Sequence, residues 1–283
     1  MENPFKPTIT ISDSSQIPDI MIDSEVRSSN IIRHLLENVG KYKTLVISGY
    51  LGEGKTTTLF EVAREISDRE NWLTVSLSMK SDNVIADFAA ALKEYELIGL
   101  NQSSYRILQD KKFSNEHYII KVLTSLTKKG YNTLVTLDDV VVNDDCELLK
   151  FAAFYRRLAT KKIAISTLLA ATTDVTSAIC TDKLLTVLLA PQIVKLPLNE
   201  LQVHVTYHDV FKKGKRLMTG GACSEAARYV SYFGYTFQVV GYLLWENTAE
   251  GDKIPVAKVR ESEPPLPTHT LRGRGFLGRV QTY

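Results

Sequence analysis

Residues 49–56 have the types and the spacing that bind a polyphosphate. They read Gly-Tyr-Leu-Gly-Glu-Gly-Lys-Thr and satisfy the pattern G-x-x-x-x-G-K-[ST]. The glycines let the backbone turn until successive amides face one anion, and the start of a following helix adds its own unsatisfied amides. We therefore predict that this loop holds a nucleoside triphosphate, and the alternative is a chance match. The residues expected to bind the nucleotide are Gly49, Tyr50, Leu51, Gly52, Glu53, Gly54, Lys55, Thr56 and Thr57.

Three side chains of this segment have specific expected roles. The Lys55 ammonium would bridge the β- and γ-phosphates and take part in catalysis, and the Thr56 hydroxyl would ligate Mg²⁺. Thr57 is placed to meet the α-phosphate. The flanking pattern agrees with this reading, because an apolar run at 44–48 precedes the loop and an amphipathic run at 57–66 follows it.

Two adjacent carboxylates form the second candidate for chemistry. Asp138 and Asp139 follow the apolar run 131–137, and open α/β sheets bind their ligands at the carboxyl ends of strands. Asp138 would hold Mg²⁺ through water, and Asp139 would orient or deprotonate the attacking water. The alternative is a pair of solvated carboxylates in a turn. Because many ATPases carry glutamate at the second position and aspartate is shorter, we expect slow hydrolysis.

Thr172 is the third candidate, at the end of the apolar run 163–170. A polar residue at the tip of this strand can sense the γ-phosphate in ATPases that have an inserted strand between the two motif strands. The alternative is an ordinary strand-to-helix cap, in which Thr173 or Asp174 closes a helix that begins at Val175.

Short apolar segments alternate with longer amphipathic ones along the part of the chain that must position these residues. No proline lies between Ser24 and Ala190, as expected for a continuous run of packed strands and helices. Alternation with long connections requires right-handed crossovers and a mostly parallel sheet. The expected strands are 44–48, 73–78, 133–137, 163–170 and 193–196. The expected helices are 24–39, 55–67, 84–96, 116–128, 146–158 and 175–185, followed after Pro197 by 200–211, 224–232 and 237–248.

The composition excludes several classes of protein. The 283 residues include 34 Lys and Arg against 32 Asp and Glu, so the net charge of +2 excludes histone-like proteins and acidic tails. With 44% hydrophobic and 23% charged residues, the chain is typical of a soluble globular protein. Its longest apolar runs are too short for a bilayer, and its start lacks the order of a secretory signal. Three cysteines without paired spacing indicate no disulfide or zinc framework, and we expect a cytoplasmic protein without membrane contact.

The order of these motifs resembles a known family, the stand-alone bacterial AAA-type ATP-binding proteins related to origin-recognition and STAND ATPases. The loop resembles a Walker A motif and Leu137-Asp138-Asp139 a Walker B motif. The resemblance covers about residues 3–250 and includes Asn3-Pro4-Phe5-Lys6-Pro7, Leu196-Pro197-Leu198 and the segment 234–245, which is similar to the family's lid helix. It implies an α/β P-loop NTPase fold of AAA type, with a five-stranded mostly parallel sheet and a small helical lid.

The expected organisation follows from the pattern and the resemblance together. An N-terminal extended segment (1–23) precedes a P-loop ATPase α/β domain (24–197). A helical lid subdomain (198–250) follows, and a flexible tail rich in Pro, Gly and Arg (251–283) ends the chain.

This sequence departs from the family pattern at several positions. Family members commonly carry Gly-Arg before the first helix, where this chain has Asp23-Ser24, and an arginine near the end of the helix before the fifth strand, where 186–191 has none. Thr236 replaces the usual proline of the lid motif, and 251–283 cannot supply the DNA-binding winged helix that relatives often carry. An arginine finger is worth about 10³–10⁵ in rate, so its absence favours a nucleotide-gated switch over a fast motor.

The leading prediction is a protein that binds ATP and Mg²⁺, hydrolyses ATP slowly, and passes lid closure to a protein partner or to further copies of itself. The alternatives are a non-hydrolysing nucleotide-binding signalling or scaffold module, and a P-loop kinase. The basic run 212–216 could contact DNA phosphates, or it is a solvated loop between lid helices. His204 and His208 have a spacing that can bind a metal, although surface histidines of a helix have the same spacing.

Overall fold

The computed structural model describes residues 1–7, 18–22, 24–37, 43–99, 114–142, 146–188, 192–194, 198–230 and 233–262. The chain divides into two compact units. One, the sheet unit, comprises Thr10–Ile17 and Asp23–Leu196. The other, the helical unit, comprises Met1–Ile9, Pro18–Ile22 and Pro197–Tyr283.

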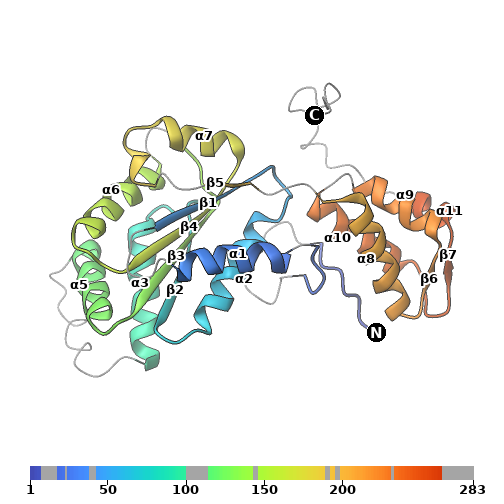
Figure 1. Cartoon of the computed structure of the whole chain (residues 1–283), viewed down its shortest axis with the longest axis horizontal. Coiled ribbons are helices and arrows are strands. Elements are labelled where there is room, and N and C mark those ends of the chain that lie inside the picture. Colours follow the sequence, from blue (N-terminus) through green and yellow to red (C-terminus); the bar gives the residue numbers. More distant parts are fainter. Residues whose placement is uncertain are drawn as a thin grey trace. The chain divides into compact units, whose positions relative to one another are not determined.

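A five-stranded parallel sheet forms the centre of the sheet unit (Figure 1). The strand order is β2-β3-β4-β1-β5, so the predicted α/β fold with an inserted strand β4 between β3 and β1 is confirmed. Every residue of β4 is buried, as the continuous apolar runs predict for a sheet that is covered on both faces. The strands are β1 (Lys43–Ser48), β2 (Trp72–Ser78), β3 (Asn132–Asp138), β4 (Ile165–Ala171) and β5 (Gln192–Val194).

Helices cover both faces of this sheet, and their local sequences explain where they begin. Ser114 and Thr172 cap α5 and α7 by accepting the amides of His117 and Val175. The predicted helix 175–185 therefore begins earlier, and it ends at Thr181 before a short 3₁₀ turn, η2 (Leu185–Leu188). The helices are α1 (Ser24–Leu36), α2 (Lys55–Ser67), α3 (Val84–Gly99), α5 (Asn115–Lys128), α6 (Glu147–Thr160) and α7 (Thr173–Thr181).

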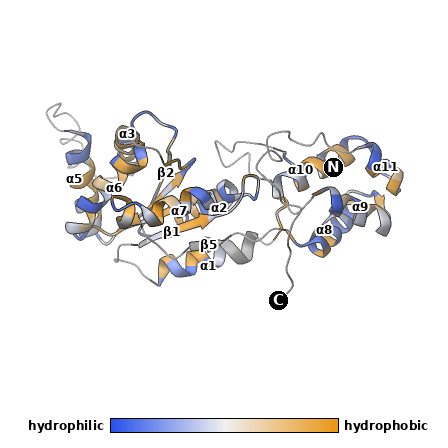
Figure 2. Cartoon of the chain, turned by 90° about the horizontal axis from the view of Figure 1, so that it is seen from above, coloured by the Kyte–Doolittle hydropathy of each residue, from blue (hydrophilic) through white to orange (hydrophobic). Residues whose placement is uncertain are grey.

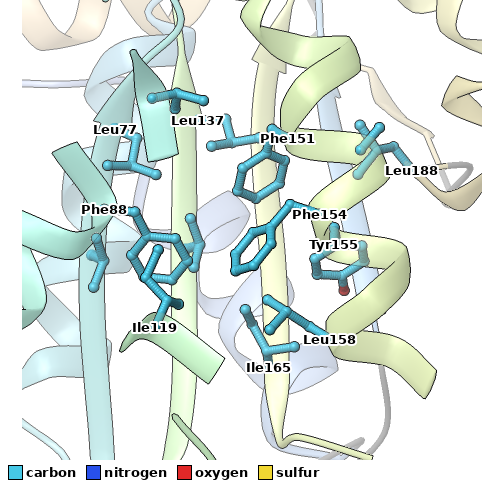
Figure 3. Packing of buried hydrophobic residues seen from close by; sticks show 14 of the residues in the cluster. Leu77, Phe88, Ile119, Leu137, Phe151, Phe154, Tyr155, Leu158, Ile165 and Leu188 are labelled. Carbon is cyan, nitrogen blue, oxygen red and sulfur yellow. The ribbon is translucent and has the colours of Figure 1, made fainter. Parts of the chain in front are cut away.

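The hydrophobic core of the sheet unit lies in two layers, one on each face of the sheet. Side chains of α1 and α2 pack on one face, and those of α3, α5 and α6 pack on the other. Figure 3 shows Phe151 and Phe154 pointing from α6 toward the strands that carry Leu137 and Ile165. Helices of both units carry hydrophobic and hydrophilic residues along the same helix, the pattern of helices that are buried on one side (Figure 2).

The helical unit packs its helices around an aromatic cluster that the N-terminal segment completes. Phe5 is 1% exposed, and its ring lies 5.7 Å from that of Phe237 and 6.3 Å from that of Trp245. A Cβ atom at Gly241 would lie 2.4 Å from the Phe5 ring, so only glycine fits there. The amide of Lys6 donates to Gln238 Oε1 at 3.0 Å. The helices are α8 (Glu200–Lys213), α9 (Gly220–Val230), α10 (Gly234–Glu246) and α11 (Val256–Glu261).

Two expectations about the end of the chain are wrong. The expected helical lid (198–250) does not consist of helices alone, because it contains β6 (Leu217–Met218), which pairs in parallel with β7 (Lys253–Ile254). The flexible tail does not begin at residue 251, because β7 and α11 are folded and Ile254 and Val259 are buried in the core of the helical unit. The remainder of that expected tail, 263–283, lies outside the described residues.

The N-terminal stretch is likewise more than an extended segment on its own, since its described residues belong to the helical unit. Within the described ranges, no helix is both long enough and apolar enough to cross a membrane.

Candidate nucleotide-binding site

The loop between β1 and α2 has the backbone geometry of an anion-binding turn. Gly52 and Gly54 adopt φ angles of 84° and 77°, in the left-handed region that side chains with a Cβ atom disfavour. Helix α2 then begins at Lys55, and the Thr58 amide makes the first helical hydrogen bond to the Gly54 carbonyl at 3.1 Å. The first turn of α2, which includes Thr56 and Thr57, therefore offers its amides and the positive end of the helix dipole at this loop.

The Lys55 side chain reaches from the end of the loop back to its beginning. Its Nζ donates to the carbonyl oxygens of Gly49 at 3.0 Å and Tyr50 at 2.7 Å. An ammonium has three donors, so these two bonds hold it in place while it retains the capacity to bond a phosphate oxygen. Burial lowers the pKa of Lys55, and the negative charges of Glu53 and Asp138 act in the opposite direction.

The Glu53 side chain turns into the loop instead of toward solvent. Glu53 is only 9% exposed, and its Oε2 accepts the Tyr50 amide at 2.7 Å. The sequence pattern assigns Glu53 a place in the loop through its backbone alone, so the role of its carboxylate is not predicted from the motif. The neighbouring Tyr50 and Leu51 are 51% and 69% exposed.

The structure brings Asp138 to the phosphate loop from the end of β3. Its carboxylate lies near the Thr56 side chain and the Lys55 ammonium. Burial raises the pKa of Asp138, and both of these neighbours act to lower it. Three residues that the sequence assigns to phosphate and metal therefore meet at one place.

Asp139 contacts other residues than Asp138 does. Its Oδ1 lies 2.8 Å from Lys80 Nζ, and its Oδ2 accepts the Ser78 hydroxyl at 3.3 Å. Asp139 also has a φ angle of 54°, unusual for a residue with a side chain. Neither Ser78 nor Lys80 is identified by the sequence, although β2 and β3 pair in register with Ser78 beside Asp138. The order of the strands, which no local motif reveals, creates this contact.

The contacts of Thr172 are those of a helix cap. Its hydroxyl accepts the Val175 amide at 3.5 Å, and its carbonyl oxygen accepts the amide of Thr176 at 2.9 Å. The Thr176 hydroxyl in turn donates to Ser48 at 3.0 Å, at the end of β1. The cap alternative is thus observed with Thr172 itself as the capping residue, in place of Thr173 or Asp174.

Two weaker candidates from the sequence have ordinary structural surroundings. Arg216 is buried, with its guanidinium 4.0 Å from the Trp245 ring, and Lys215 pairs with Glu250 at 3.3 Å, so the basic run is not a continuous exposed cationic surface. His204 Nδ1 lies 3.2 Å from Ser224 Oγ. Across the described ranges, no three His, Cys, Asp or Glu side chains gather into a metal site. Asp23 and residues 189–191, where the sequence departs from the family pattern, lie outside the described part of the chain.

The sequence model of the NB-ARC domain family matches residues 24–192, which include the phosphate loop, Asp138 and Asp139. The chain belongs to the NB-ARC family. This family match confirms the predicted relation to STAND ATPases, and the family supports nucleotide binding by this P-loop. A search of curated proteins finds no match.

Several solved structures of low sequence identity share the fold of this NB-ARC chain. The Walker-type ATPase paby2304 of Pyrococcus abyssi matches with a TM-score of 0.61 and 14% identity, over 86% of this chain and 71% of that one. The ORC1 protein of Aeropyrum pernix, solved in complex with DNA, matches with a TM-score of 0.57 and 13% identity, over 93% and 70%. Cdc6p from Pyrobaculum aerophilum matches with a TM-score of 0.55 and 14% identity, over 84% and 63%. This chain thus spans less than two thirds of the length of Cdc6p.

Proposed function

We propose that this chain binds ATP with Mg²⁺ at the phosphate loop and hydrolyses it slowly. The observation that carries the proposal is the convergence of Lys55, Thr56 and Asp138, which come from two strand ends that are far apart in the sequence. Their chemistry fits the ligand. A hydroxyl and a carboxylate are oxygen donors of the kind that Mg²⁺ prefers, and an ammonium beside helix-start amides complements a triphosphate.

Each residue of the site has a definite part in this proposal. Lys55 would contact the β- and γ-phosphates from its position under the Gly49 and Tyr50 carbonyls. Thr56 and Asp138 would hold Mg²⁺, which neutralises phosphate charge when it is bound. Asp139 would orient the attacking water and accept its proton. The Thr172 side chain would act first as the cap of α7, with a contact to the γ-phosphate as its second expected role.

The contacts of Asp139 support slow hydrolysis. A carboxylate that is bonded to Lys80 and Ser78 must leave these partners, or share them, before it can receive a proton from water. The same contacts favour the second candidate function, a non-hydrolysing nucleotide-dependent signalling or scaffold module. In either function the helical unit would be the lid that responds to nucleotide, in the cytoplasm, with a protein partner or another copy of the chain as the receiver of the change.

Nucleotide binding and steady-state turnover of the wild type and Asp139→Ala separate the two candidates. Slow ATPase activity predicts that both proteins bind Mg-ATP equally and that only the wild type releases phosphate above background. If both bind ATP and neither turns it over, the ATPase function is excluded and the signalling module remains. If the wild type does not bind ATP, the proposed function is lost in both forms.

A further inference from the structure

Two opposite charges of the phosphate loop contact the same residue. The Lys55 ammonium donates to the Tyr50 carbonyl oxygen at 2.7 Å, and the Glu53 carboxylate accepts the Tyr50 amide at 2.7 Å. Glu53 is 9% exposed, so water screens its charge poorly. Its negative charge acts on the Lys55 ammonium, as does that of Asp138. The negative charge of Glu53 is therefore built into the cradle that the phosphates must enter.

The side chains of this cradle carry more negative than positive charge. The one cation, Lys55, faces the two carboxylates Glu53 and Asp138 among the described residues that act on it, so the side chains together carry a net negative charge. The backbone amides and the positive end of α2 add attraction for phosphate. A nucleotide that enters without a metal would bring its full negative charge to this place. Bound Mg²⁺ removes two of those charges, and the repulsion falls in proportion.

We propose that Glu53 determines specificity by making the loop select nucleotide that carries Mg²⁺ over metal-free nucleotide. This inference rests on the proposed nucleotide-binding function. The side chain has two effects that can be separated. Its oxygen braces the loop by accepting the Tyr50 amide, and its charge repels uncompensated phosphate. Glutamine keeps an oxygen acceptor at the same distance along the side chain and removes only the charge.

The test is a calorimetric titration of the full chain with ATP, once in excess EDTA and once in excess MgCl₂. Glu53→Gln is expected to bind metal-free ATP about tenfold more tightly than the wild type and Mg-ATP only about threefold more tightly, because the repulsive charge is gone from both complexes but weighs more on the first. The selectivity for Mg-ATP therefore falls about threefold. Glu53→Ala also loses the brace, and we expect it to bind both forms more weakly than Glu53→Gln.

Controls make the outcome specific to this position. Glu65→Gln removes an exposed carboxylate from α2, one that pairs with Arg69, and is expected to leave both affinities within twofold of the wild type. A midpoint of thermal unfolding for Glu53→Gln equal to that of the wild type would show that the variant is folded. Equal changes in the two affinities, or no gain for metal-free ATP, would overturn the role of Glu53. A wild type that binds neither form would instead overturn the nucleotide site itself.

Discussion

The candidate site has two parts whose side chains differ in their contacts. We call the loop after β1 with Asp138 the binding end, and the tips of β2 and β3 with Asp139 the hydrolysis end. Around the loop after β1, Lys55, Thr56 and Asp138 already meet, and backbone carbonyl oxygens hold the Lys55 ammonium. At the tips of β2 and β3, Asp139 is bonded to Lys80 and Ser78. Adjacent carboxylates thus serve different neighbours. Nucleotide binding and water activation can therefore be adjusted independently in this fold, even though Asp138 and Asp139 are consecutive.

The strength of the contacts differs as well. The turn of the phosphate loop depends on glycines with positive φ angles, and the Lys55 ammonium donates to main-chain carbonyl oxygens of the same loop. The Lys80–Asp139 pair has side chains that are 67% and 31% exposed, and pairs of this kind contribute only about 0.2–1 kcal/mol. Asp139 can therefore exchange between its observed contacts and the nucleotide at a small cost, while the binding end stays fixed.

The largest expected effect is at the binding end. Lys55→Ala removes the ammonium from the loop, and we expect the affinity for Mg-ATP to fall at least about a hundredfold, as charge-assisted phosphate contacts are lost. Calorimetric titration measures this loss. Arg64→Ala, which removes an exposed cation from the same helix, is the matched control and is expected to bind normally. Retained affinity in Lys55→Ala would show that the loop is not the binding site.

The second effect isolates the hydrolysis end. Asp139→Asn keeps the shape of the side chain but cannot accept a proton, so turnover is expected to fall about a hundredfold. The affinity for Mg-ATP should stay within about twofold, because the contacts of Asp139 are with Lys80 and Ser78 and not with residues of the loop. Phosphate release and titration are measured on the same preparation. A parallel loss of affinity and turnover would mean that the two ends are one unit.

A smaller effect of opposite sign is expected at Lys80. Lys80→Met removes the cation that holds Asp139, and we expect the turnover number to rise about threefold, within the range that an exposed ion pair allows. Lys80→Arg keeps the pair and should retain the wild-type rate. Steady-state assays at saturating Mg-ATP check both variants. A slower Lys80→Met enzyme with unchanged affinity would indicate that Lys80 assists the reaction instead of restraining it.

The smallest effect concerns the anchor of the segment that carries Lys80. The buried Glu147 carboxylate accepts the amide of Val84, the first residue of α3, and pairs with Lys150. Desolvation by burial would raise the pKa of Glu147, but the hydrogen bonds from Lys150 and Val84 outweigh it, and the pKa is lowered. Glu147→Gln keeps an acceptor for Val84 and loses the charge, so a loss of about 1 kcal/mol in the free energy of unfolding is expected at pH 7.

The pH dependence of that loss follows from the direction of the shift. Because the pKa of Glu147 is lower in the folded chain, the unfolded chain binds the proton more tightly. The stabilisation is complete above the unfolded pKa of about 4.3 and disappears as the pH falls through the folded value. Denaturant unfolding of both proteins between pH 3 and pH 7 measures it. A difference between them that does not shrink in acid would contradict this assignment.

Much of the fold and of the binding end could be predicted from the sequence, because the signals there are local. The phosphate loop fixes its own turn through Gly52 and Gly54, and the apolar run before Asp138 identifies a buried strand that ends in a carboxylate. Parallel strands bring such ends to one edge of the sheet, which is why Thr56 and Asp138 could be expected to meet.

The rest depends on which segments become neighbours, and a single sequence does not contain that information. Ser78 and Lys80 contact Asp139 because β2 pairs with β3. Phe5 fills the space beside Gly241 only when the N-terminal segment packs in the helical unit, although both belong to segments that resemble the family. The sequence around Ile254 and Val259 has too few apolar residues to predict a folded segment. Only the structure shows that both side chains are buried in the core of the helical unit.

A single-turnover partition experiment tests the difference between the two ends most directly. Wild type and Lys80→Met are loaded with labelled ATP and Mg²⁺, then mixed with excess unlabelled ATP, and the released label is separated into ATP and ADP. We predict that both proteins bind the same amount of label, that the wild type releases most of it as ATP, and that Lys80→Met releases a larger share as ADP. Equal partition in the two proteins, or conversion of nearly all label to ADP by the wild type, would contradict a complete binding end beside a restrained hydrolysis end.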